Sequence, residues 1–301
     1  MWRRAIWALG VVVCLAAPVA VHAQGDYLDV YTVKVKPEKV ADFQALSKKW
    51  IDANRRFDGD HWLAQETMYG EGGTYAFVSM RGSYADIDKA MMASMGAVNK
   101  AFGKEGTEKL LHDWESCLAG SRSELRRRRW DLSRKAPADA AAWAKYVGES
   151  RFLRTIAVHV RPGHAPEFEA MLKEAKAAGE KITDAQPIYV SQAAEGSKGT
   201  IYYITALRSS LGGFDKNPTL RDILGEEGFK RFQQVNAESV EGTESVLTRF
   251  SPELSNPPEE IATVAVDFWH PKAALSASAS KPKNLGAKNA ELKPAADKPK
   301  P

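Results

Sequence analysis

The sequence predicts an α+β fold in which two tandem βαββαβ repeats close into one pseudo-dimeric α/β barrel. Two observations predict it. Residues 26–133 and 151–255 carry matching sequence blocks in the same order, and both halves show the same succession of strand-like and helix-like periodicity. The chain has 301 residues, of which 44% are hydrophobic, and this composition is typical of a globular protein with room for two cores.

Four blocks match between the halves, with only small gaps between them. The first pair is separated by 125 residues along the chain and the second by 126. The matched ranges are 33–37 with 158–162, 71–78 with 197–204, 103–106 with 225–228, and 129–133 with 249–255. Four blocks in one order are hard to obtain by chance, which indicates an internal duplication.

Each repeat opens with a predicted strand, at residues 30–36 and 155–161, which ends at a proline that cannot continue a sheet ladder. An amphipathic helix follows in each repeat because apolar residues recur at helical spacing. These residues are Val40, Phe43, Ser47 and Trp50 in the first repeat and Phe168, Leu172 and Ala175 in the second.

A hairpin comes next in each repeat, with predicted strands at 63–69 and 74–80, and at 188–192 and 200–207, joined by glycine-containing turns. A second amphipathic helix carries Leu111, Trp114 and Leu118, or Phe229, Phe232 and Val235. The last strand covers residues 121–130 or 244–250. The resulting order, βαββαβ, is that of the ferredoxin-like unit.

The N-terminus predicts export. Arg3 and Arg4 precede an apolar run over residues 5–20, and residues 21–23 form an A-x-A-like cleavage site, so residues 1–23 are a predicted signal peptide. We expect a periplasmic or secreted protein without a transmembrane segment in the mature chain. Lipidation of Cys14 is the alternative, although Val13 is not the small residue that lipoprotein signals place before the cysteine.

The remaining segments lie outside the repeats. Residues 134–150 are a predicted linker, residues 256–274 a C-terminal extension that packs on the body, and residues 275–301 a disordered tail rich in Lys, Pro and Ala. Without the signal peptide, Cys117 is the remaining cysteine, so no internal disulfide is expected and folding depends on core burial.

The positive net charge comes from the ends of the chain. The sequence has 42 basic and 38 acidic residues, and removal of the signal peptide leaves 40 against 38. Residues 272–301 hold seven lysines, one Glu and one Asp, so 33 basic and 36 acidic residues remain in the body. A slightly acidic body disfavours nucleic-acid binding, which needs a basic surface on the folded domain.

In its element order and duplication, the chain resembles the dimeric α/β-barrel superfamily, which contains the antibiotic-biosynthesis-monooxygenase-like domains. The resemblance covers residues 26–255 and includes no family-specific catalytic string. It implies a barrel closed by two sheets within one monomer, acting as an intramolecular pseudo-dimer. Members include cofactor-independent monooxygenases and haem-binding or haem-degrading enzymes. Because none of their functional residues can be matched here, the catalytic residues stay unknown and the fold alone assigns no activity.

His159, Lys34 and Arg161 are the candidate ligand-binding residues. In its strand, Val158 and Val160 share the face that we assign to the helices, so His159 and Arg161 point to the opposite face, the predicted barrel interior. Lys34 is the counterpart of His159 in the first repeat. These groups would suit an anionic ligand, and the histidine alone would suit acid–base chemistry or haem. A histidine satisfied by hydrogen bonds at a sheet end is the simpler interpretation.

Other motifs give weaker signals. Arg126 to Arg129 follow one another on a predicted strand, so alternation sends Arg126 and Arg128 to one face and Arg127 and Arg129 to the other. Pairing with the nearby carboxylates Glu124 and Asp131, as at a rim or edge, is favoured over binding of a carboxylate or phosphate group. Cys117 lies at helical spacing from apolar residues, so we expect it to be a buried apolar side chain and not a reactive thiol. No metal site and no cofactor are expected, with haem as the alternative.

Two classes of function therefore remain. The first is a binding or interaction module whose barrel holds a small anionic or aromatic ligand, and it is favoured because no catalytic constellation is visible in the sequence. The second, implied by the resemblance, is a cofactor-independent monooxygenase or a haem-binding or haem-degrading enzyme.

Overall fold

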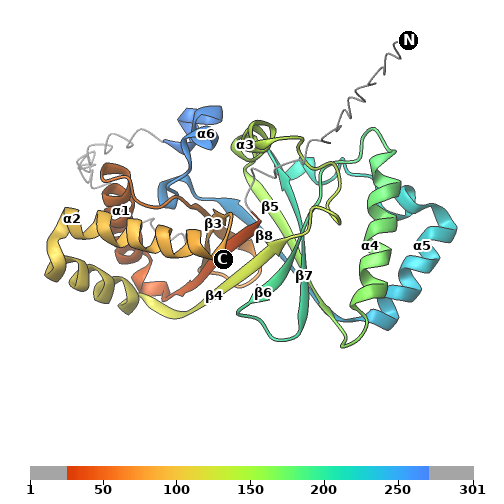
Figure 1. Cartoon of the computed structure of the whole chain (residues 1–301), viewed down its shortest axis with the longest axis horizontal. Helices are drawn as coiled ribbons and strands as arrows, with labels where there is room; N and C mark the ends of the chain where they lie inside the picture. The colour runs from red at the N-terminus through yellow and green to blue at the C-terminus, as the bar shows by residue number, and fades with distance from the viewer. Residues whose placement is uncertain (1–25, 271–301) are drawn as a thin grey trace, which may run out of the picture.

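The computed structural model describes residues 26–270, and its central feature is a closed eight-stranded β-barrel (Figure 1). The strands follow the order β1-β3-β2-β8-β5-β7-β6-β4, and β4 pairs back onto β1. All eight pairings are antiparallel. The strands are β1 (Tyr27–Val35), β2 (Leu63–Tyr69), β3 (Thr74–Arg81), β4 (Leu118–Arg128), β5 (Phe152–Val160), β6 (Tyr189–Glu195), β7 (Thr200–Arg208) and β8 (Val240–Phe250). The predicted mixed α/β class with a closed barrel is confirmed.

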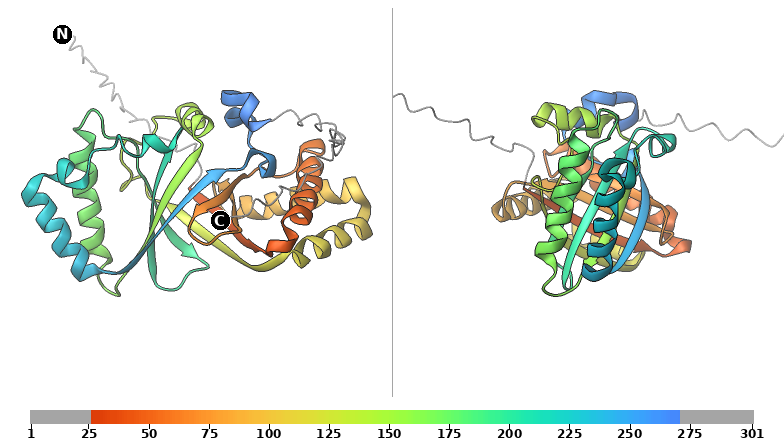
Figure 2. Two further views of the ribbon diagram at one scale, coloured as in Figure 1. Left: turned by 180° about the vertical axis from the view of Figure 1, so that it is seen from behind. Right: turned by 90° about the vertical axis from the view of Figure 1, so that its right-hand side faces the viewer.

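Four long helices cover the barrel from two opposite sides (Figure 2). The helices α1 and α2 pack together on one side, and α4 and α5 on the other. Their bounds are α1 (Val40–Arg56), α2 (Tyr84–Ser116), α4 (Ala165–Glu180) and α5 (Leu220–Ser239). Among residues 26–270, no helix has the length and apolar character needed to cross a membrane.

The element order β-α-β-β-α-β occurs twice along the chain. Within the first half the strands are arranged β4-β1-β3-β2, and within the second β8-β5-β7-β6. The two half-sheets meet at two seams, where β2 pairs with β8 and β4 pairs with β6. Closure of the barrel therefore needs strands from both halves.

Alternation along the strands separates a helix-facing core from a barrel interior. Val33 lies on the outer face of β1, in one core cluster with Phe43 of α1 and Tyr75 of β3. Val158 of β5 lies in the equivalent cluster with Phe168. The Phe43 ring centroid is 5.2 Å from that of Tyr75. These contacts confirm the predicted assignment of alternate residues to the helix side.

The strand register corrects one sequence alignment. Lys34 pairs with Thr74 across β1 and β3, whereas His159 pairs with Ile201 across β5 and β7. If Lys34 and His159 are counterparts, Thr74 corresponds to Ile201, an offset of 127 instead of the 126 taken from the sequence. Because side chains alternate with a period of two, this shift exchanges the faces and places Tyr203 in the barrel interior.

One end of the barrel is covered by segments outside the strands. The region predicted as a linker, 134–150, contains helix α3 (Ala140–Glu149), which contacts α6 (Glu259–Ala262) of the C-terminal extension. The extension ends in α7 (Val266–Trp269), where the Trp269 side chain is fully buried and donates from Nε1 to the Gly148 carbonyl at 3.0 Å. The predicted signal peptide, Cys14 and the tail 275–301 lie outside the described residues.

Two buried serines connect segments from different halves. The Ser133 hydroxyl accepts the backbone N–H of Val190, on β6, at 2.9 Å and donates to the Arg129 carbonyl at 2.8 Å. The Ser255 hydroxyl accepts the N–H of Ala64, on β2, at 2.8 Å. Each serine hydroxyl thus accepts a hydrogen bond from a backbone N–H on a strand of the other half.

We expect Ser133→Ala and Ser255→Ala each to lower the free energy of unfolding by about 1–3 kcal/mol, because a buried N–H loses its acceptor. Urea denaturation measures this, and the two effects should add because the sites share no partner. The exposed Ser245→Ala on β8 serves as control. A loss below about 0.3 kcal/mol for both serines would show that these contacts do not hold the seams.

Candidate ligand-binding cavity

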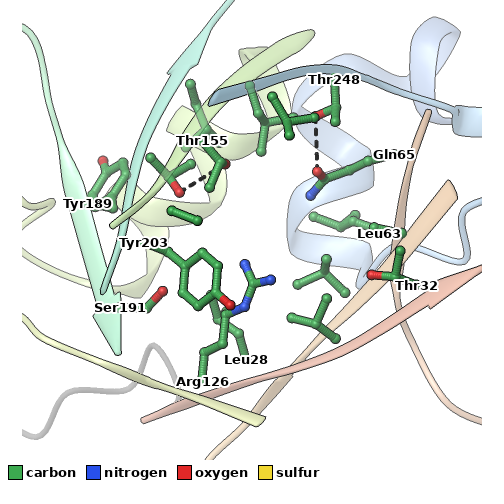
Figure 3. Close-up of a pocket in the computed structure, with 18 of the residues that line it drawn as sticks. Leu28, Thr32, Leu63, Gln65, Arg126, Thr155, Tyr189, Ser191, Tyr203 and Thr248 are labelled. Atoms are coloured by element: carbon green, nitrogen blue, oxygen red, sulfur yellow. Dashed lines mark hydrogen bonds between the residues drawn. The ribbon is translucent and has the colours of Figure 1, made fainter. Parts of the chain in front are cut away.

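The barrel encloses a cavity of about 590 Å³ (Figure 3). It is lined by residues that alternate with the helix-facing core, such as Leu28, Val30 and Thr32 of β1. Trp143 and Val147 of α3 line it at the covered end. The cavity therefore has one closed end and one end at the strand termini near Lys34 and His159.

The walls near the closed end are mostly apolar. They include Leu28, Leu63, Val78, Met80, Leu153, Leu207 and Phe250. Two polar pairs in the wall satisfy each other: Thr155 and Thr205 share a hydrogen bond of 3.1 Å, and Thr248 donates to Gln65 at 3.0 Å. Such a lining offers a ligand apolar contact without leaving these polar groups unpaired.

Two of the three sequence candidates line the opposite end. Lys34 forms an ion pair with Glu71 at 3.0 Å and donates to the Gly72 carbonyl, while its side chain stays 33% exposed. His159 lines the same cavity. Arg161 is exposed and does not line it, because β5 ends at Val160 and strand alternation no longer applies. Ligand binding by Lys34 and His159 stays a prediction.

The polar centre of the cavity is Arg126, which projects from β4 beside Tyr203 (Figure 3). Its Nε and Nη2 donate to Oε2 of Glu124 at 3.0 and 2.8 Å. Its Cζ lies 3.5 Å from the centroid of the Tyr203 ring. Nη1 donates to no group among residues 26–270. Arg126 is thus fixed on two sides and retains one charged donor.

Glu124 is the group that holds this arrangement. Its carboxylate accepts hydrogen bonds from Arg126, Tyr203, Ser197 and Arg122. Burial by itself would raise the pKa of Glu124, but the charge of Arg126 and the hydrogen bonds outweigh burial and hold the pKa below its usual value. Glu124 is therefore an anion at neutral pH, and it orients Arg126.

Protonation of Glu124 at low pH should weaken its interactions with Arg126 and lower the stability of the fold. Because the folded-state pKa of Glu124 lies below its unfolded value, its stabilising effect is complete above the unfolded pKa and is lost as pH falls through the folded one. We expect unfolding free energy to drop less steeply below about pH 4.5 in Glu124→Gln than in the wild type. Urea titrations at several pH values measure the slopes, with Glu244→Gln as an exposed control. Equal slopes would contradict the role of Glu124.

The arginine run splits as strand alternation predicts. Arg126 and Arg128 line the cavity, Arg127 is exposed, and Arg129 faces the helices, where it pairs with Asp131 at 2.8 Å. The predicted pairing with Glu124 and Asp131 is confirmed, and the strand is not a sheet edge, because the barrel is closed.

Arg128 adds a second positive group near the closed end. It lies over two indole rings, with Cζ 4.5 Å from the Trp143 centroid and 5.2 Å from that of Trp130. Burial lowers the pKa of Arg128. A guanidinium nevertheless stays protonated at neutral pH, so both inward arginines bring charge to the cavity.

Two buried hydroxyls of the lining have no hydrogen-bond partner within the described residues, Tyr189 Oη and Thr74 Oγ1. Burial raises the pKa of Tyr189, which keeps its hydroxyl a neutral donor. Buried polar atoms of this kind call for a partner such as water or a ligand. The sequence does not mark Tyr189 or Glu124 as a ligand-binding residue, although alternation on β4 places Glu124 on the same face as Arg126.

Metal-ligating side chains do not cluster within residues 26–270, and Cys117 is buried. Among residues 26–270, no group of three or more His, Cys, Asp or Glu side chains is placed to hold a metal ion. Cys117 is buried and its Sγ lies 3.4 Å from the Asp113 carbonyl, in agreement with its predicted place in the core.

No family model matches the chain, and no curated protein matches it. Solved structures similar to it include an anthrone oxidase-like protein, at 14% identity and a TM-score of 0.47, with 77% of this chain and 94% of that one covered. A protein from Fusobacterium nucleatum described as a candidate monooxygenase has 11% identity and a TM-score of 0.47, with 74% and 91% covered.

A chlorite dismutase from Candidatus Nitrospira defluvii, in complex with imidazole, has 10% identity and a TM-score of 0.45, with 81% of this chain and 97% of that one covered. At this level of similarity the likeness concerns the fold alone. Function has to be argued from the cavity itself.

Proposed function

We propose that the protein is a binding module whose barrel holds one small molecule with an anionic group and an apolar body. The observation that carries this proposal is Arg126, whose Nη1 faces a largely apolar cavity while Glu124 and the Tyr203 ring fix the rest of the guanidinium. A fixed donor loses little entropy on binding, which favours recognition of a carboxylate.

The charge balance of the interior supports the sign of the ligand. Four basic side chains, Lys34, Arg122, Arg126 and Arg128, line the cavity, against the lining carboxylates Glu71 and Glu244 and the carboxylate of Glu124 beside Arg126. An anionic ligand would therefore meet more basic than acidic groups, in a space where apolar walls weaken solvent screening. The volume of about 590 Å³ lies within the range of small-molecule sites.

The polar groups beside Arg126 are arranged for binding. The Tyr203 hydroxyl and two of the Arg126 nitrogens are engaged by Glu124, whose lowered pKa keeps it from donating a proton. This engagement positions a cation and leaves these groups without an acid–base role. A binding module therefore fits the interior better than the oxygenase alternative.

The residues around His159 do not fit haem. No hydrogen bond among residues 26–270 orients the His159 ring, whereas histidines that bind metals nearly always donate their second ring nitrogen to a partner. Tyrosine can also ligate haem iron, but the Tyr203 hydroxyl donates to Glu124, and burial raises the pKa of Tyr189, which disfavours the phenolate that would bind iron. We expect no Soret band after incubation with haem. A band that disappears in His159→Ala would contradict this.

Calorimetry with two isosteric probes tests the binding function. Titration of the full chain with 2-naphthoate should give saturable binding to one site, and the uncharged 2-naphthamide should bind at least about tenfold more weakly, because it lacks the charge that Arg126 recognises. Equal affinities would show an apolar cavity without anion recognition, and the absence of binding by either would count against the proposal.

We also infer that the two halves are tandem ferredoxin-like repeats, that one chain closes the barrel as a monomeric pseudo-dimer, and that the protein is exported. The repeated element order and the two seams support the first two inferences. The third rests on residues 1–23 of the sequence. The mass of the chain recovered from periplasm or medium tests it, and a chain that still begins at Met1 would contradict it.

A further inference from the structure

A second cavity, of about 340 Å³, lies outside the barrel between its sheet and two helices. Its floor is the outer face of β1 and β3, and its walls come from α1 and α2. It shares no lining residue with the barrel cavity. A ligand in this second cavity would therefore contact none of the residues that line the barrel cavity.

The shape of α2 creates this cavity. The helix has 33 residues and breaks at Gly103, whose φ of 70° lies in the left-handed region that favours glycine. Ser94 before the break and Trp114 after it both line the cavity. The corresponding helix α5 breaks at Gly225 with the same φ but has 20 residues, with only 220–224 before the break. The long first arm thus belongs to the first half alone.

Aromatic rings dominate the lining. They are Tyr31, Trp50, Trp62, Phe77 and Trp114. Each indole N–H is already engaged: Trp50 with Ser94 at 3.2 Å, Trp62 with a backbone carbonyl at 2.9 Å, and Trp114 with Ser47 at 2.9 Å. A ligand therefore meets ring surfaces without free indole donors. Except for Trp62, these aromatic side chains remain partly exposed.

The charged groups of this lining are mainly acidic. Asp29, Asp60 and Glu115 face one cation, Arg81. Arg81 donates from Nη1 and Nη2 to the two oxygens of Asp60 at 2.8 and 2.7 Å, so the two charges balance each other. The Nε of Arg81 lies 3.5 Å from the carboxylate of Asp29. Two carboxylates remain in excess beside the aromatic rings.

We propose that this cavity binds a small organic cation with a methylated or quaternary ammonium group, of the size of choline. Ring faces attract such a cation through their quadrupoles, and the two excess carboxylates supply the balancing charge. A free ammonium compound fits better than a phosphocholine head group, because an added phosphate would meet the same carboxylates. The barrel interior, with its positive charge, has the opposite preference.

The test is a titration of the full chain with choline, in which calorimetry and tryptophan fluorescence measure binding. Choline should bind saturably, and its uncharged isostere 3,3-dimethylbutan-1-ol should bind at least about tenfold more weakly. Phosphocholine should also bind more weakly than choline. Equal binding of choline and the isostere, or no saturable binding of choline, would overturn the proposal, and tighter binding of phosphocholine would identify a head-group site instead.

Substitutions in the lining test whether choline binds in this cavity. Trp114→Leu should lower choline affinity by about five- to tenfold, and Asp29→Asn by about two- to fivefold. Asp52→Asn, an exposed residue of α1, is the matched control and should change nothing. Thermal melts confirm folding of each variant, and Asp29→Asn provides the test if Trp114→Leu does not fold. Arg126→Gln should leave choline binding unchanged. Unchanged affinity in a folded Asp29→Asn and in a folded Trp114→Leu would overturn the assignment.

Discussion

Replacing Arg126 with glutamine should lower the affinity of the barrel for 2-naphthoate by about 10- to 100-fold, the usual effect of losing a charge-assisted hydrogen bond. The affinity for 2-naphthamide should change little. The structure explains the selectivity, because Arg126 presents Nη1 to the cavity while Glu124 holds its other nitrogens. Calorimetry on the folded variant measures both affinities.

Arg127→Gln is the matched control for this change. Arg127 is the next residue on β4, is exposed and does not line the cavity, so the variant loses the same net charge without loss of affinity. Arg126→Gln also leaves Glu124 with fewer partners, and the double variant Glu124→Gln/Arg126→Gln separates that effect on stability from the effect on binding. Equal losses of affinity in Arg126→Gln and Arg127→Gln would contradict the proposed anchor.

Neither residues 26–133 nor residues 151–255 alone should form a stable monomer. Separation of the halves removes both barrel seams, where Gln65 pairs with Phe250 and Arg128 with Ser191. It also exposes apolar interior residues of each sheet, at a cost of about 25 cal/mol for each Å² of apolar surface, which is large against the net stability of a domain. Each half should aggregate, unfold or form a homodimer.

Sedimentation and thermal melting of the separate halves decide this, with the full chain as reference. The full chain should sediment as a monomer, because it supplies both sheets itself. A well-folded monomeric half that melts cooperatively near the temperature of the full chain would show independent domains. That result would remove the shared interior on which ligand binding depends.

Strand periodicity predicted much of the fold and part of the site. It placed Val158 on the helix side and His159 in the interior, and it divided Arg126 from Arg127, because each depends only on local alternation. The hairpin strand 63–69 coincides with β2, since glycines mark the turn that follows it. Strand alternation and glycine turns are local patterns, so the sequence is enough to predict the features that depend on them.

Contacts between distant segments were not predictable in this way. The contact between Glu124 on β4 and Tyr203 on β7 joins residues that are distant in the sequence. The alignment of the two hairpins is wrong by one residue, because glycine turns tolerate a shift in length, and this error assigns Tyr203 to the wrong face. The sequence predicts a linker where α3 lies, since the role of this helix depends on packing over the barrel end. The cavity under α2 depends on the break at Gly103, which no periodicity reveals.

The most direct test of the central claim is a crystal structure of the full chain with 2-naphthoate. We expect one molecule inside the barrel, with its carboxylate within hydrogen-bonding distance of Arg126 Nη1 and its rings against apolar residues such as Leu28 and Leu63. A probe seated outside the barrel, or inside it with the carboxylate turned away from Arg126, would contradict the account.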